Sequence, residues 1–380
     1  AHQRRTGGNA EFAVNIPRGG SNNVTVKATL NRVNAGNLLA ALPITLPEQV
    51  RDLNGQTSGT VDITGLPNES RGVINLAAQK GMVAGQAFDG LNVKAIFNGT
   101  TIDLQQGEMR IGTGQLTARG MYDRAGGNFN FDLSGKSLPV PLAMALLPKN
   151  DSIPVITGDL DLAANATGNS NRTASYNISF NGIAPNVQVG ENVLGQVVFK
   201  GQTANQVLTA DLTATLEGRP QVINATVNFG NEDMPFMVAT DFNQSPLAPF
   251  LAFVPQLKGM AITGTGTGRV EFGGNLSQLN DKGVREFSTS ALTGKAEFSQ
   301  LSMLIQDTPL SAAEPILVRF NPREVVFEKA RFSGGGSNMT ITGAKALTDA
   351  GINNLAIDGR VNLNLINLFV KDTFFSGFAD

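Results

Sequence analysis

The chain has 380 residues, a net charge of −2 and only 16% charged residues, which argues against a nucleic-acid-binding surface. It has no cysteine and one histidine, His2, so cysteine–histidine metal sites and histidine-based triads are excluded. No stretch reaches the roughly 18–20 apolar residues of a membrane-spanning helix. The first residues, Ala1–Ala10, lack the apolar core of a signal peptide.

The chain opens in the middle of a strand pattern. Apolar residues alternate with polar ones through Val24–Val33, which predicts a half-buried strand. We expect Val26, Ala28 and Leu30 to line an apolar groove. Because the pattern begins part-way through and a new motif opens near the end, we expect the chain to be a piece of a longer protein. An anchor or targeting segment would then lie outside it.

A motif recurs three times, at Asn37–Gly65, Ser137–Gly168 and Pro246–Gly274. Each copy has a Leu-rich segment with helical spacing that ends at a proline, followed by a strand-like segment with two glycines. Asn364–Val370 resembles the Leu-rich beginning of a fourth copy of the motif. The prolines, about 105 residues apart, are Pro43, Pro148 and Pro255, and the glycine pairs are Gly55/Gly65, Gly158/Gly168 and Gly264/Gly274.

Self-similarity at a fixed period predicts a repeat array. We expect a mostly β fold: an elongated array with one short helix in each repeat. The helices would brace one edge of the sheet. The expected divisions are 1–36 (end of a preceding repeat), 37–140 (repeat 1), 141–245 (repeat 2), 246–363 (repeat 3) and 364–380 (start of a further repeat).

Short strands, punctuated by Gly, Asn and Asp, are expected between the helices. The most regular pair is Leu208–Leu216 and Ile223–Phe229, joined through Glu217–Pro220. The polar segment Gln278–Glu286 reads as a surface loop, and a slip of the apolar phase before Leu301 predicts a bulge or turn. The further candidate groove-lining residues are Leu208, Leu212, Leu216, Ile223, Val227, Phe229, Ile357, Val361 and Leu363.

The apolar face of so many strands needs a cover. One helix of about eight residues in each repeat cannot cover it. The strands could fold over into a closed β-helix or a sandwich, or they could leave an open groove. The sequence alone favours none of these alternatives.

The recurring motif resembles the TamB/AsmA-like family of bacterial envelope proteins. The matching segments are Leu38–Gly65, Leu142–Gly168 and Leu247–Gly274, and the glycine-turn strand Gly334–Gly343 is similar to another recurring element of that family. The resemblance implies a long U-shaped sheet with an apolar inner groove and a role in moving phospholipids between the inner and outer membranes. It also implies a periplasmic location, an inner-membrane anchor outside this chain and an outer-membrane barrel protein as a partner.

Candidate catalytic groups are sparse. Asp159/Asp161 and Glu232/Asp233 are carboxylate pairs, but solvated strand positions are the ordinary explanation. The glycine-rich stretch Gly264–Gly268 could cradle a phosphate, yet it stands where the other copies have strand glycines, which favours a structural role. We therefore expect no enzyme activity, no metal and no cofactor.

Three functions remain open. The first is a non-enzymatic lipid conduit or scaffold, which binds phospholipid acyl chains and no nucleic acid. The second is a secreted or surface β-solenoid of the adhesin or passenger type, whose rungs are usually shorter than this period. The third is a β-helical enzyme that degrades polysaccharides, which needs clustered acids and bases on one face.

Overall fold

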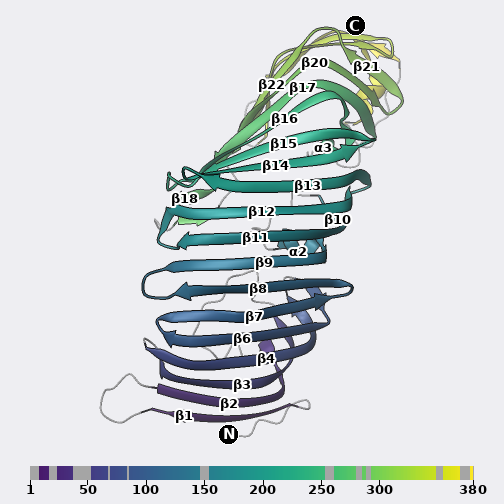
Figure 1. Cartoon of the computed structure of the whole chain (residues 1–380). Coiled ribbons are helices and arrows are strands. Elements are labelled where there is room, and N and C mark those ends of the chain that lie inside the picture. Colours follow the sequence, from purple (N-terminus) through teal and green to yellow (C-terminus); the bar gives the residue numbers. More distant parts are fainter. Residues whose placement is uncertain are drawn as a thin grey trace. The chain divides into compact units, whose positions relative to one another are not determined.

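The structure is a computed structural model, and it consists almost entirely of antiparallel β-sheet (Figure 1). Twenty-four strands are assigned to one sheet, and β18 and β19 form a separate pair. The mostly β prediction is therefore confirmed. The structure describes residues 8–16, 24–36, 53–66, 69–83, 85–145, 154–252, 261–279, 285–287, 292–347, 354–368 and 377–379.

The chain divides into two compact units. Unit 1 comprises Ala1–Lys149, Thr157–Pro185 and Lys200–Gln206, and unit 2 comprises Asn150–Ile156, Asn186–Phe199 and Val207–Asp380. Both units are built from consecutive strands that pair with their neighbours in the chain. These units do not test the expected repeat boundaries, which remain predictions.

In unit 1 the strands follow one another as antiparallel neighbours from β1 to β12, and β5 is a short pairing at the end of β4. The strands are β1 (Asn9–Asn15), β2 (Val24–Asn34), β3 (Asn54–Leu66), β4 (Ser70–Val83), β5 (Gln86–Phe88), β6 (Gly90–Gly99), β7 (Thr101–Ile111), β8 (Gly114–Asp123), β9 (Asn128–Pro139), β10 (Ile156–Thr157), β11 (Asp159–Asn169) and β12 (Arg172–Val189).

In unit 2 the pairing runs from β14 through β15, β16, β17, β20, β22, β23 and β24 to β25, again antiparallel. The strands are the first part of β13 (Asn192–Ala204), whose residues from Lys200 belong to unit 1, and then β14 (Val207–Leu216), β15 (Arg219–Asn228), β16 (Pro235–Pro246), β17 (Ile262–Asn275), β18 (Ser277–Leu279), β19 (Arg285–Phe287), β20 (Thr293–Ile305), β21 (Thr308–Ala312), β22 (Ile316–Phe320), β23 (Glu324–Gly334), β24 (Ser337–Ala346), β25 (Ala356–Asn362) and β26 (Phe378–Ala379).

Many strands are longer than the sequence pattern predicts: β4 has 14 residues and β12 has 18. The reason is that interior glycines do not end these strands. Gly72 lies opposite Phe97, and Gly120 lies opposite Phe131. The Phe131 ring fills the space beside Gly120, and at Gly72 a Cβ would meet the Asp62 carbonyl, so both glycines serve close packing within their strands.

Three local predictions can be compared with the structure. The slip before Leu301 is a bulge, because the register of β17 and β20 shifts around Ser299. Glu217 and Gly218 form the turn between β14 and β15, both with positive φ. The loop prediction for Gln278–Glu286 is wrong in part, since β18 and β19 pair there as a small hairpin. The polar composition of this segment shows no strand pattern, because only three residues of β18 pair with three of β19.

The same bulge occurs at three places. In each, two residues of one strand lie opposite one residue of the next: Asn31–Arg32 opposite Ser58, Lys136–Ser137 opposite Asp161, and Asn243–Gln244 opposite Thr267. The second residue of each pair is left-handed, with φ of 55° at Arg32, 46° at Ser137 and 51° at Gln244.

One hydrogen bond accompanies every one of these bulges. The backbone N–H of the left-handed residue donates to the side-chain oxygen of the residue opposite. The distances are 3.0 Å to Ser58 Oγ, 2.7 Å to Asp161 Oδ1 and 3.1 Å to Thr267 Oγ1. The bond gives a partner to a donor that the bulge removes from the strand ladder, and so offsets part of the cost of the left-handed residue.

Replacement of Asp161 by alanine should destabilise unit 1 by about 0.5–1.5 kcal/mol, because the Ser137 N–H loses its acceptor. Urea unfolding followed by circular dichroism measures this change. Asp159→Ala, two residues earlier on the same exposed side of β11, is the matched control and should change stability little. Equal losses in the two variants would show that the bulge does not depend on this bond.

A short helix follows the second and the third bulge. These helices are α2 (Val140–Ala145) and α3 (Ala248–Leu251), at the right in Figure 1, and a 3-10 helix, η3 (Leu363–Leu368), follows β25. Each begins with a backbone bond to a glycine carbonyl: Val140 to Gly158, Leu247 to Gly264 and Leu363 to Gly377. The helix predicted at Asn37–Leu42, and Leu146 with the helix-ending prolines, lie outside the described residues.

Both described α-helices bury side chains against the sheet. Leu142 of α2 is 3% exposed. Phe250 of α3 meets the ring of Phe242 at 4.9 Å between centroids, and Phe242 in turn lies 5.6 Å from Phe298. Gly266 makes room for this contact, since a Cβ there would meet Leu247 and the ring of Phe298. The helices therefore pack on the side of the sheet that carries the apolar residues.

Leu142→Ala should lower the free energy of unfolding by about 2–4 kcal/mol, because truncation leaves a cavity between α2 and the sheet. Thermal and urea melts measure the loss. Val14→Ala, at a strand position that is 57% exposed, is the control and should be close to neutral. A negligible effect at Leu142 would mean that α2 does not support the sheet.

Candidate functional site

One side of the sheet in unit 1 is continuously apolar, and we call it the apolar face. Residues directly opposite each other in an antiparallel ladder share a face, so the register defines rows across the strands. One row crosses ten strands without a polar side chain. Its members are Phe12, Ala28, Val61, Ile74, Ala95, Leu104, Gly120, Phe131, Ala166 and Ile178.

Unit 2 has an apolar face of the same kind. A row across seven strands comprises Leu212, Ile223, Thr240, Val270, Ala296, Val318 and Phe327. Its one polar member, Thr240, is buried and satisfied: its hydroxyl donates to the Val222 carbonyl and accepts from Gln221 Nε2. Thr240 therefore adds no unsatisfied polar group to this row, and the other members are apolar.

The opposite side, the outer face, carries the charges. Lys27 and Asp62 pair on it at 3.1 Å in unit 1. In unit 2, Arg269 contacts both Asp241 and Glu271, and Lys295 also contacts Glu271. Hydrogen bonds from Arg269 and then Lys295 lower the pKa of Glu271, and those to Asp241 and then Glu271 raise the pKa of Arg269. These exposed pairs add little stability and are typical of a solvated face.

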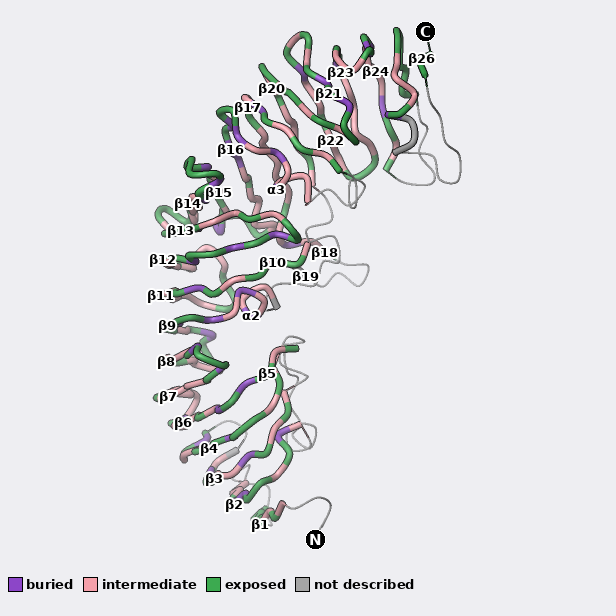
Figure 2. Tube along the Cα trace, turned by 90° about the vertical axis from the view of Figure 1, so that its right-hand side faces the viewer, coloured by how far each residue is buried: buried purple, intermediate pink, exposed green. Residues whose placement is uncertain are grey.

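Most of the apolar face is only partly buried (Figure 2). In the row of unit 1 only two members, Ala28 and Ala95, are buried, while Phe131 is 39% exposed and Phe12 is 57% exposed. A close-packed interior would bury the large side chains first. This face is therefore accessible along much of unit 1.

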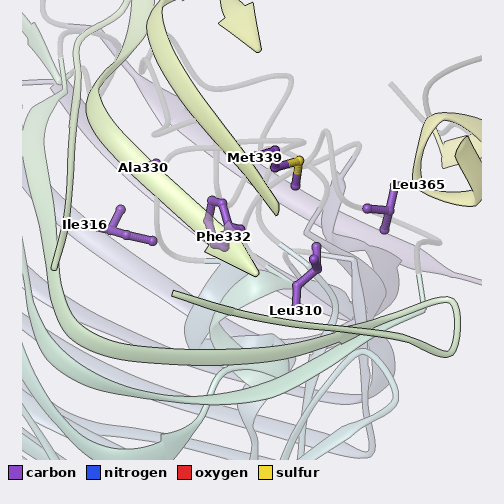
Figure 3. Close-up of a cluster of buried hydrophobic side chains, with 6 residues drawn as sticks. All are labelled: Leu310, Ile316, Ala330, Phe332, Met339 and Leu365. Carbon is purple, nitrogen blue, oxygen red and sulfur yellow. The ribbon is translucent and has the colours of Figure 1, made fainter. Parts of the chain in front are cut away.

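The last strands of unit 2 form a packed core instead. Figure 3 shows side chains from β21 to β24 and from η3 that converge on one cluster. Leu310 is 2% exposed and Ala330 is fully buried, and Leu365 of η3 closes the cluster. The other members are Ile316, Phe332 and Met339. The apolar patterns of the strands in the two units are alike, so this difference in burial is not predictable from them.

The predicted groove-lining residues lie in three places. Val26, Ala28 and Leu30 share the apolar face of β2 in unit 1. In unit 2, Leu208 pairs with Val227 and Leu212 pairs with Ile223, whereas Leu216 and Phe229 are buried near the strand ends. Ile357 and Val361 lie on β25, where Val361 packs against the Leu310 core, and Leu363 begins η3.

The groups weighed for catalysis have structural surroundings. Asp161 holds the bulge at Ser137, and Asp159 is exposed at the start of β11. Gly264–Gly268 lies inside β17, paired on both sides, and a Cβ at Gly264 or Gly268 would meet a neighbouring carbonyl. Within the described residues, no three acidic, histidine or cysteine side chains gather as a metal site. The described helices also include none with the length and apolarity of a membrane span.

Sequence reasoning missed several residues of the apolar face, among them Ile74, Leu104, Phe131 and Ile178. Each belongs to a strand in which a glycine interrupts the alternation, such as Gly72 in β4 or Gly135 in β9, and their phase becomes clear only from the register. Comparison of the chain with protein-family models, curated proteins and solved structures finds no match in any of the three.

Leu212→Arg should leave unit 2 folded with a modest loss of stability, because its side chain is only partly buried and arginine can reach water. Leu310→Arg should unfold the end of unit 2, since it buries an unpaired charge. Thr213→Arg, on the outer face of the same strand, is the control. Circular dichroism and urea melts compare the three variants. Unfolding by Leu212→Arg would show that the face is closed there as well.

Proposed function

We propose that this chain is a non-enzymatic lipid-binding segment whose apolar face holds the acyl chains of phospholipids. The observation that carries the proposal is the row from Phe12 to Ile178, which is apolar on ten consecutive strands yet largely unburied. Acyl chains gain about 0.8 kcal/mol for each methylene that they bury, so such a face is a favourable site for them.

The recurring bulges support the finer architecture. We propose that the chain is an array of repeats that forms a curved, groove-like sheet, with the motif of bulge, helix and glycine marking each repeat. Arg32, Ser137 and Gln244 stand at the interval expected of such repeats. Bulges bend strands, and three of them at matching positions would curve the sheet in the same sense.

The surface β-solenoid is the second candidate. The packed core around Leu310 favours it locally, because such proteins have close-packed interiors. The antiparallel pairing of successive strands favours the groove, because rungs of a β-helix stack in parallel. The half-exposed apolar face of unit 1 also favours the groove.

We further propose a cellular setting on the basis of the resemblance to TamB/AsmA-like proteins. The segment would lie in the periplasm and move phospholipids between the inner and outer membranes. An inner-membrane anchor and an outer-membrane barrel protein would be its partners in the whole protein. The chemistry of the two faces is compatible with this setting, since one face suits acyl chains and the other suits water.

Phe131→Arg should lower the amount of phospholipid that copurifies with the chain. Loss of contact with about two methylenes costs about 1.6 kcal/mol, or about a tenfold loss of affinity. Mass spectrometry and phosphorus analysis of the purified protein measure the bound lipid, and circular dichroism verifies the fold.

Met121→Arg is the matched control. Met121 belongs to the neighbouring strand β8, is 45% exposed and lies on the outer face opposite Asn130. Its replacement should leave lipid content unchanged. If the parent protein carries no lipid and takes up none from vesicles, the proposed function is wrong. Equal depletion in both variants would show that the apolar face is not the binding surface.

A further inference from the structure

Both tyrosines of the chain lie in one cluster on the apolar face of unit 1. Tyr122 is the cross-strand partner of Phe129. The Phe129 ring meets Tyr176 edge-on at 5.6 Å between centroids and stacks on Phe131 at 6.2 Å. Gly168 leaves the space for these rings, because a Cβ there would lie 2.9 Å from Tyr176. We call Tyr122, Phe129, Phe131 and Tyr176 the aromatic cluster.

The aromatic cluster adjoins one end of the strands, where tight turns follow one another, at the left in Figure 1. The turn after β8 is bonded to its neighbours on both sides: the Arg124 N–H donates to Thr100 O, and the Ser170 N–H donates to Gly127 O. Arg124 Nη2 also donates to Gly99 O at 2.8 Å and to Ser70 Oγ at 3.0 Å. We call this end the turn rim.

Polar and positively charged groups occupy the turn rim beside the tyrosines. Arg124 follows Tyr122 by two residues, and the exposed Arg172 begins the strand that carries Tyr176. Asn169, at the turn between β11 and β12, donates to Gly126 O and Asn128 Oδ1. Hydrogen bonds from Thr100 and from the backbone of Gly126 and Ala125 occupy the Asp123 carboxylate and lower its pKa.

Away from the turn rim, the apolar face becomes aliphatic. The row beyond the aromatic cluster contains Ala118, Leu133 and Ala164, and the row after that contains Leu116 and Leu162. Along the strands, the side chains therefore change from arginine through tyrosine to leucine and alanine. A phospholipid has the same order, from phosphate through ester groups to acyl chain. Tyrosine suits the middle level because its ring is apolar and its hydroxyl is polar.

We infer that the aromatic cluster fixes the direction and depth of a bound phospholipid on unit 1. The ester level lies against Tyr122 and Tyr176, the phosphate lies toward Arg124 and Arg172, and the acyl chains run toward Leu116. Guanidinium groups match phosphate in charge and in hydrogen-bond geometry. This inference rests on the proposed function and adds to it the orientation of the lipid.

The two tyrosines offer a direct test, because the chain has no tryptophan to mask their fluorescence. The purified chain is loaded with phosphatidylcholine that carries a nitroxide quencher either near the ester end or near the methyl end of one acyl chain. We expect stronger quenching by the label near the ester end. Tyr122→Phe and Tyr176→Phe, measured singly, separate the two contributions.

A relocated reporter provides the matched control. The triple variant Tyr122→Phe, Tyr176→Phe and Leu116→Tyr moves the only fluorophore along β8 by about 20 Å at ~3.4 Å per residue. The order should then reverse, with the methyl-end label as the stronger quencher. Circular dichroism verifies that the variant is folded, and a second reporter at Leu162→Tyr replaces it if it is not.

The arginine contribution has its own comparison. Arg172→Gln should weaken phosphatidylcholine binding about twofold to fivefold, the range of an exposed charge pair, and leave diacylglycerol binding unchanged. An equal loss for both lipids, or no loss for either, would contradict the phosphate contact.

The outcomes separate the two proposals. Equal quenching by the two labels, or stronger quenching by the methyl-end label in the parent chain, overturns the orientation. If phospholipid binds but neither label quenches the tyrosines, the lipid lies elsewhere, and this result also overturns the orientation. Failure to bind any phospholipid, measured by phosphorus analysis, removes the proposed function itself.

Discussion

The structure depends on strand register. A slip of one residue would move every apolar side chain to the outer face, so the ladder must keep its phase across many strands. The three bulges meet this constraint with an extra residue each. In β2 the apolar face passes from Leu30 to Val33, a step of odd length, and the bulge at Arg32 absorbs the difference. In β9 the face passes from Gly135 to Leu138 in the same way.

This constraint explains how much the sequence could predict. Regular strands such as β14 and β15 show their faces by simple alternation, and they pair with each other as neighbours. Glycine accounts for most of the differences, because its composition signal marks a strand boundary, whereas Gly72 and Gly120 lie inside strands, opposite Phe97 and Phe131. The sequence pattern predicts a solvated strand position for Asp161, and its role at the bulge depends on Ser137 in another strand.

On the apolar face, the sequence predicts which residues share a side of the sheet but not which of them are buried. Alternation placed Leu212 and Ile223 on one face correctly, but it could not tell a packed core from an accessible surface. Leu310 and Leu212 have the same side chain, yet η3 and the strands β22 to β24 surround the first while the second remains partly exposed. Burial of this kind depends on which segments meet, and local sequence carries little of that information. The aromatic cluster is equally unpredictable from the sequence, because its members are separated along the chain and come together only through strand pairing.

The acceptors at the three bulges are a serine, an aspartate and a threonine, although all accept the same backbone hydrogen bond. Selection at such a position would act on the presence of a short side chain with an oxygen, and the residue type could drift freely among several options. In the proposed repeat array, copies of the motif could therefore diverge until little common sequence remained while their strands still joined in the same way. A chain built like this can lengthen or shorten by whole units during evolution, with each junction already compatible with the next.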